Sequence, residues 1–134
     1  MKYKVGDIFS KDFAITSNLI KEFCLITGDN NPLHSEDDYA KRMSFEKRIA
    51  PGLLIGSLIA SVIGNDFPGS GTIYLSQTLK FTRPTYVDDT VSIKIEITDI
   101  KRNNWIVLKT HCVNQNMKTV LVGEAVVTIN EDKE

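Results

Sequence analysis

The sequence of 134 residues has little of what marks metal-binding, disulfide-linked or nucleic-acid-binding proteins. It holds only two cysteines, Cys24 and Cys112, and two histidines, His34 and His111, whose wide spacing gives no zinc-binding pattern. Sixteen basic and 17 acidic residues leave a net charge of -1, so no basic excess indicates a nucleic-acid partner. Both cysteines stand in apolar segments, which favours free, buried thiols in a reducing compartment.

Long hydrophobic runs are also missing. The longest uncharged stretch, residues 49–65, is shorter than the ~20 residues of a membrane-spanning helix, and Pro51 interrupts it. The first ten residues lack the apolar core of a signal peptide, so we expect a cytoplasmic protein with no membrane segment. A hydrophobic fraction of 42% is enough to build a core, and no linker or repeat divides the chain. We therefore expect residues 1–134 to form a single domain.

Two helix signals separated by a polar turn follow an extended opening at residues 5–15. Ser17 is a candidate N-cap, and Gly28 is a suitable residue to end the first helix. The sequence Asp-Asn-Asn-Pro at residues 29–32 predicts a turn, and a second short helix is expected at residues 35–43. The apolar residues expected on one face of the first helix are Leu19, Phe23 and Ile26.

The most hydrophobic segment is residues 49–65. Pro51 suits the first turn of a helix, and apolar side chains surround the segment, so we expect a helix buried on all sides. Small residues recur four apart along it and form a ridge that allows a sheet or a helix to approach closely. These residues are Gly56, Ala60 and Gly64.

Beyond Gly71 the hydrophobic pattern changes to a period of two, which is typical of half-buried antiparallel strands. A turn at Asn103-Asn104 and another at residues 116–118 separate the last strands. One buried helix followed by an antiparallel meander predicts the α+β class, with a curved sheet around the helix. Such a sheet has an open edge that dimerisation would cover. The alternating apolar residues are Ile73, Leu75, Leu79 and Phe81, then Val91, Ile93, Ile95 and Ile97.

The first candidates for chemistry are Asp29 and His34, five residues apart across Pro32. The proline prevents them from sharing a helix face, but a tight turn can direct both side chains into one pocket as an acid–base pair. From these residues alone, ordinary turn and capping roles remain open, because Asp, Asn and Pro are common turn residues.

The stretch 23–34, Phe-Cys-Leu-Ile-Thr-Gly-Asp-Asn-Asn-Pro-Leu-His, resembles the signature of the MaoC-like (R)-specific enoyl-CoA hydratases. Two further segments resemble that family in the same order: Ile-Ala-Pro-Gly-Leu-Leu at 49–54, and the strand pair within 71–91. The resemblance implies a hot-dog fold, in which an antiparallel sheet wraps a long helix. It also implies a homodimer that reversibly hydrates trans-2-enoyl-CoA to (R)-3-hydroxyacyl-CoA.

The resemblance also assigns roles to individual residues. It implies that Asp29 and His34 are the catalytic pair and that Asn31 supports their turn. Ala60 and Ile63 fall where the family lines the acyl end of its pocket. Many members carry a histidine where this chain has Pro51, and some have a larger or polar residue at the position of Ala60. The second difference leaves the preferred acyl length open.

Hydration of an enoyl thioester makes three demands: water loses a proton as it attacks the β-carbon, the α-carbon gains one, and the thioester oxygen accepts negative charge. Asp29 and His34 sharing one water meet the first two, and we assign neither as the sole base. The backbone N–H of Gly52 suits the third, because the start of a helix favours an anion. Since no electrons are transferred, we expect no redox cofactor, and we expect no metal.

Two other functions remain as alternatives. A hot-dog acyl-CoA thioesterase often needs a carboxylate on its central helix, and residues 52–64 contain none. A non-catalytic acyl-thioester-binding subunit need not keep both Asp29 and His34.

The sequence leaves open the choice between coenzyme A and acyl carrier protein. It also leaves open the pathway, with fatty-acid oxidation, polyhydroxyalkanoate precursor supply and fermentation all compatible. Lys80, Arg83 and Lys101 are candidate contacts of the coenzyme phosphates, although most such basic residues are simply exposed to solvent. Gln77 and His111 favour structural roles.

Overall fold

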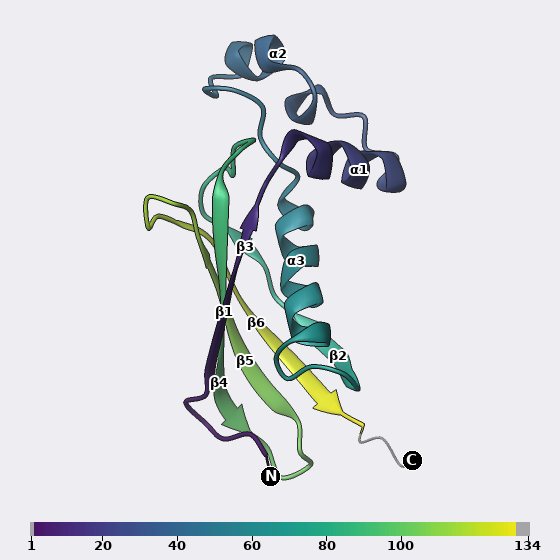
Figure 1. Cartoon of the computed structure of the whole chain (residues 1–134), viewed down its shortest axis with the longest axis vertical. Helices are drawn as coiled ribbons and strands as arrows, with labels where there is room; N and C mark the ends of the chain where they lie inside the picture. Colours follow the sequence, from purple (N-terminus) through teal and green to yellow (C-terminus); the bar gives the residue numbers. More distant parts are fainter. Residues whose placement is uncertain (1, 131–134) are drawn as a thin grey trace.

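A curved antiparallel sheet holds a long helix in its hollow in the computed structural model, which describes residues 2–130 (Figure 1). The sheet has the order β1-β4-β5-β6-β2, with β3 pairing separately with β6. The strands are β1 (Ile8–Ala14), β2 (Thr72–Gln77), β3 (Lys80–Phe81), β4 (Thr90–Ile100), β5 (Ile106–Val113) and β6 (Thr119–Ile129). The helices are α1 (Ser17–Thr27), the 3₁₀-helix η1 (Pro32–His34), α2 (Asp37–Arg42) and α3 (Gly52–Asn65). The α+β class expected from the sequence is confirmed.

The period-two pattern is clearest in β4, at the centre of the core. Val91, Ile93, Ile95 and Ile97 are fully buried, while the alternate residues of the strand face outward. The three long strands β4, β5 and β6 form the expected meander. The first strand, β1, joins one edge beside β4, and β2 joins the other edge beside β6.

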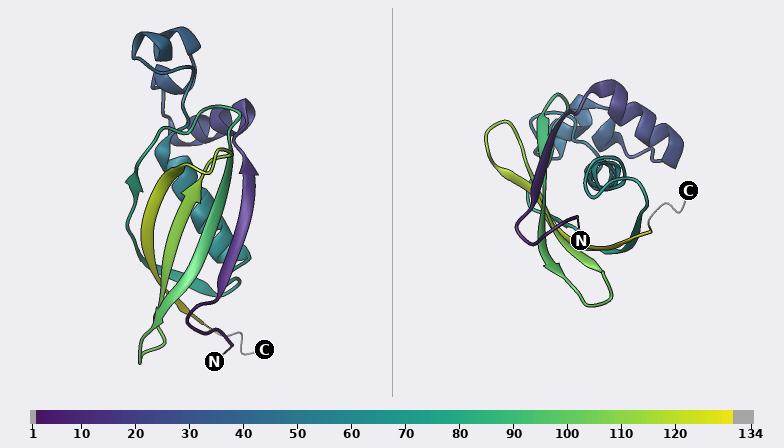
Figure 2. Two further views of the ribbon diagram at one scale, coloured as in Figure 1. Left: turned by 90° about the vertical axis from the view of Figure 1, so that its left-hand side faces the viewer. Right: turned by 60° about the horizontal axis from the view of Figure 1, so that its bottom comes forward.

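The expectation that residues 49–65 form a helix buried on all sides is wrong for the single chain. The face of α3 toward the sheet is buried, whereas Leu53 on another face is 60% exposed and Ala60 is also exposed. An end-on view shows the sheet curving around one side of the helix only (Figure 2). A helix that is apolar on every side is favoured to be buried on every side, but the single folded chain covers only part of its surface.

The second departure concerns β2 and β3, where the expected apolar face is largely uncovered. Ile73, Leu75 and Phe81 are exposed, and the register of β2 against β6 shifts between Tyr74 and Ser76. A bulge of this kind interrupts the alternation of side chains, so the simple pattern does not predict which residues face the core.

The first helices also differ in detail from the sequence-based expectation. Thr16, not Ser17, is the N-cap of α1, since its Oγ1 accepts a hydrogen bond from the backbone N–H of Leu19 at 3.0 Å. Ile26 is 85% exposed, and Ile20 is the buried residue of this helix. The second short helix is α2, whose N-cap position is occupied by Glu36 rather than by Ser35, with no capping hydrogen bond from the Glu36 side chain.

The helices α1 and α2 lie together at one end of the molecule, next to the N-terminus of α3, while the start of β1 and the end of β6 lie toward the opposite end (Figures 1 and 2). The turn from Asp29 to His34 connects α1 to α2, so the fold brings it close to the start of α3. Among residues 2–130, no helix is long and apolar enough to cross a membrane.

Candidate active site

The turn after α1 is shaped by its own polar side chains. Gly28 adopts a left-handed conformation with φ of 75°, which ends α1 and turns the chain. The backbone N–H of Asn31 donates to Oδ1 of Asp29 at 3.0 Å, and the N–H of Leu33 donates to Oδ1 of Asn31 at 3.1 Å. These two Asx contacts direct the chain into η1, which carries His34.

This turn brings the side chains of Asp29 and His34 together. Nε2 of His34 lies 3.6 Å from Oδ2 of Asp29, and the two side chains are 10% and 36% exposed, respectively. The two oxygens of Asp29 have different surroundings, because Oδ1 accepts the N–H of Asn31 while Oδ2 faces the imidazole. One oxygen therefore fixes the carboxylate, and the other is available for chemistry.

The second nitrogen of His34 is held by a residue from another segment. Nδ1 lies 2.8 Å from the backbone carbonyl oxygen of Ile49, just before α3. Since a carbonyl oxygen only accepts hydrogen bonds, Nδ1 carries the proton. In the neutral ring, Nε2 then has a free lone pair directed at the gap beside Asp29. No sequence signal predicts this contact, because a backbone carbonyl is present at every residue whatever its side chain.

A pocket of about 250 Å³ contains this pair together with the start of α3. Gly52 is the first residue of α3, and no acceptor within residues 2–130 reaches its backbone N–H. The pocket therefore combines two groups that exchange protons with a free donor at the positive end of a helix dipole. Its lining residues are Phe23, Thr27, Asp29, His34, Pro51, Gly52 and Leu53.

A second pocket, of about 280 Å³, opens on the α1 side of the same pair and includes Cys24. Burial, followed by the nearby Asp29 carboxylate, raises the pKa of the Cys24 thiol. The thiol therefore stays protonated near neutral pH, which argues against Cys24 as a nucleophile.

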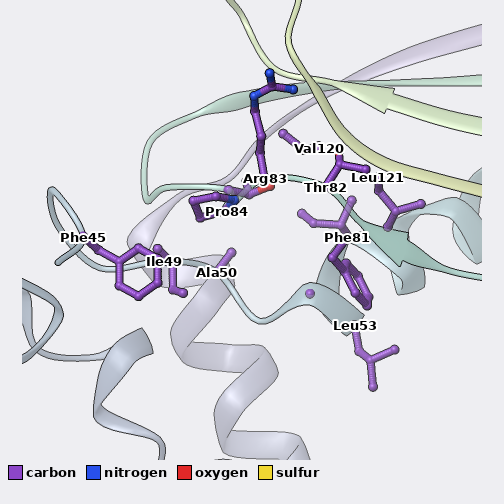
Figure 3. Close-up of a pocket in the computed structure, with 13 residues that line it drawn as sticks. Phe45, Ile49, Ala50, Leu53, Phe81, Thr82, Arg83, Pro84, Val120 and Leu121 are labelled. Atoms are coloured by element: carbon purple, nitrogen blue, oxygen red, sulfur yellow. The ribbon is translucent and has the colours of Figure 1, made fainter. Parts of the chain in front are cut away.

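A larger pocket, of about 480 Å³, adjoins Gly52 and is lined mainly by apolar side chains from β3, β6 and the segment before α3 (Figure 3). The ring of Phe81 lies over Gly52, where an added Cβ would be 2.7 Å from its Cε1 atom. The guanidinium of Arg83 points away from this pocket and donates a hydrogen bond to the carbonyl of Thr119 at 3.1 Å.

The other residues singled out from the sequence lie away from this centre. Ala60 is exposed on α3, whereas Ile63 is only 1% exposed within the core. Ala60 stands eight residues after Gly52, which is about 12 Å along a helix. Gln77 donates to Oγ1 of Thr110 across the sheet at 3.0 Å, and Nε2 of His111 lies 2.9 Å from Oγ1 of Thr119.

Comparison with known proteins places this geometry in a family context. The MaoC-like domain model matches residues 7–120. A 3-hydroxybutyryl-CoA dehydratase from Methylorubrum extorquens is 38% identical over 122 residues, which is 90% of this chain and 76% of that protein. An (R)-specific enoyl-CoA hydratase from Rhodospirillum rubrum is 35% identical over 127 residues, covering 94% and 88% of the two chains.

The solved structures agree with these relatives. The unliganded R-hydratase from Pseudomonas aeruginosa superimposes with a TM-score of 0.93 at 36% identity, covering 98% of this chain and 84% of that one. The hot-dog fold expected from the sequence is therefore confirmed.

Proposed function

We propose that this chain, which belongs to the MaoC-like domain family and is a hydro-lyase, reversibly hydrates trans-2-enoyl-CoA to (R)-3-hydroxyacyl-CoA. One observation carries the proposal. The side chains of Asp29 and His34, 3.6 Å apart, share a pocket with the free backbone N–H of Gly52. In this proposal, residues 1–134 act as one domain.

In the proposed reaction, one water molecule lies beside the pair, within hydrogen-bond reach of both Oδ2 of Asp29 and Nε2 of His34, which are 3.6 Å apart. Both atoms accept hydrogen bonds when the carboxylate is ionised and the imidazole is neutral, so the water donates to both. Its oxygen attacks the β-carbon, one of the two groups takes its proton, and the pair returns a proton to the α-carbon. The elements of water are added across the double bond, and no electrons are transferred.

The thioester carbonyl oxygen gains negative charge during this addition. We propose that it accepts a hydrogen bond from the N–H of Gly52, where the dipole of α3 adds to the attraction. Glycine suits this position because a side chain here would collide with the ring of Phe81. Asn31 supports the pair indirectly by holding the turn between them.

We propose that the acyl chain extends from this centre along α3 toward Ala60 and Ile63. The exposed apolar surface of α3 and β2, which includes Leu53, Ile73 and Leu75, supports a second copy of this chain as its cover. Sedimentation at micromolar concentration is expected to give twice the mass of one chain. A mass equal to one chain contradicts the homodimer and leaves the acyl site without a cover.

The activity itself is tested with the purified wild-type protein and crotonyl-CoA. We expect the enoyl absorbance to disappear without release of free thiol, and chiral analysis to identify the product as (R)-3-hydroxybutyryl-CoA. Release of free thiol supports the thioesterase instead. Binding of crotonyl-CoA with neither hydration nor thiol release supports the non-catalytic subunit.

A further inference from the structure

The orientation of His34 depends on a segment with little regular structure. Residues 43–51, between α2 and α3, contain neither a helix nor a strand, apart from an isolated bridge between Ile49 and Tyr86. This segment supplies the carbonyl of Ile49 that accepts the Nδ1 proton of His34. The backbone N–H of Ile49 donates in turn to the carbonyl of Leu33 at 3.1 Å. Both the carbonyl and the N–H of Ile49 therefore bond to η1, the first to the His34 ring and the second to the backbone of Leu33.

Arg48, the neighbour of Ile49, ties the segment to the two helices that flank the Asp29–His34 turn. Both its Nε and its backbone N–H donate to Oδ1 of Asp37, at 3.0 Å and 3.1 Å. Its Nη1 donates to Oγ of Ser17 at 3.1 Å. Ser17 is the first residue of α1, and Asp37 is the first residue of α2.

We propose that Arg48 and Asp37 are positioning residues, which hold the Ile49 carbonyl against Nδ1 of His34 and so keep the lone pair of Nε2 directed at the gap beside Asp29. This proposal rests on the proposed function, because the orientation of Nε2 affects the rate only if Nε2 takes part in the reaction. Neither residue lines the pocket that contains the pair, so both act through His34.

The charges around the contact support its persistence. The backbone N–H of Arg48, with smaller contributions from the Arg48 guanidinium and Lys41, holds the pKa of Asp37 below its ordinary value. Asp37 also lies in the first turn of α2, where a carboxylate is favoured. The carboxylate therefore stays ionised at neutral pH and available to both Arg48 donors.

The test compares three variants at neighbouring positions. Asp37→Ala removes the acceptor of both bonds, Asp37→Asn keeps an oxygen at the same place, and Asp38→Ala removes a carboxylate from the same helical turn. Asp38 is exposed, and within residues 2–130 its side chain makes no hydrogen bond. Because partly exposed ion pairs contribute little, we expect Asp37→Ala to lower kcat about fivefold with KM nearly unchanged. Asp37→Asn is expected to restore most of kcat, and Asp38→Ala to match the wild type.

Nitrogen NMR of the histidine rings separates positioning from a general loss of stability. The wild-type His34 signal is expected to show the form with the proton on Nδ1, and Asp37→Ala is expected to shift it toward a mixture with the Nε2-protonated form. Arg48→Gln, which keeps the backbone N–H but loses the Nε bond, provides a second variant and is expected to shift the signal in the same direction.

The NMR readout requires no turnover, so it tests the positioning even if the protein proves not to hydrate crotonyl-CoA. An unchanged His34 signal in both Asp37→Ala and Arg48→Gln overturns the proposal. An equal loss of kcat in Asp37→Ala and Asp38→Ala overturns it as well. Failure of the wild-type hydration assay alone, with the His34 signal shifted as expected, rejects the proposed function and leaves the positioning intact.

Discussion

Asp29→Asn and His34→Ala are each expected to lower kcat for crotonyl-CoA hydration by about 10²-fold or more, the scale of a positioned acid–base group. Asn at position 29 keeps an oxygen for the N–H of Asn31, so the turn is retained while the charge beside His34 is lost. Ala at position 34 removes Nε2 and also the hydrogen bond to the Ile49 carbonyl. Steady-state kinetics on proteins with wild-type circular dichroism measures both effects.

A matched control is His111→Ala, because this second histidine lies on β5 and contacts Thr119 rather than the pocket. We expect this variant to keep nearly all of the wild-type kcat. Wild-type turnover in both Asp29→Asn and His34→Ala rejects the catalytic assignment, even if the protein proves to be a hydratase.

Gly123→Ala is expected to lower the free energy of unfolding by about 1–3 kcal/mol, the usual range for forcing extra volume into a packed site. Gly123 lies in β6 where the chain between β2 and β3 crosses it, and an added Cβ would be only 2.0 Å from the carbonyl oxygen of Thr78. The backbone cannot move aside without loss of the Thr78 N–H bond to the Glu124 carbonyl and of the Glu124 N–H bond to the Thr78 hydroxyl, both 2.9 Å. Denaturant titration measures the change.

Gly64→Ala is the contrasting substitution. An added Cβ at Gly64, near the end of α3, meets no atom within 4 Å apart from its chain neighbours and the backbone of its own helix. Ala is favoured over Gly within a helix by roughly 0.5–1 kcal/mol, so stability is expected to stay the same or rise. If both variants are equally stable, the close crossing at Gly123 does not exist in solution.

The parts of the fold that were predicted from sequence are those in which local pattern and final burial agree. The alternation from Val91 to Ile97 matches an interior strand of the sheet, between β1 and β5, that packs on α3 on one side. The apolar residues Ile73 and Ile26 follow similar patterns but are exposed, because a pattern shows which residues favour burial and not what covers them. For the same reason, the exposed face of α3 was not predictable.

In the candidate site, likewise, contacts within one short segment were predictable from the sequence, and contacts between distant segments were not. The proximity of Asp29 and His34 follows from a short turn with Asx and proline residues, so it was predictable from local sequence. The contact between His34 and the carbonyl of Ile49 spans 15 residues and depends on how the segment before α3 folds back. The anchoring of that segment by Arg48 and Asp37 is equally non-local, and two charged residues 11 positions apart on the surface carry no motif.

A crystal structure of the slow Asp29→Asn variant with crotonyl-CoA tests the central claim most directly. We expect the β-carbon of the bound enoyl group to face the gap between residues 29 and 34. We also expect the thioester oxygen to lie about 3 Å from the Gly52 nitrogen, with the acyl end toward Ala60. A thioester bound elsewhere, or with its β-carbon out of reach of a water between these two side chains, contradicts the account.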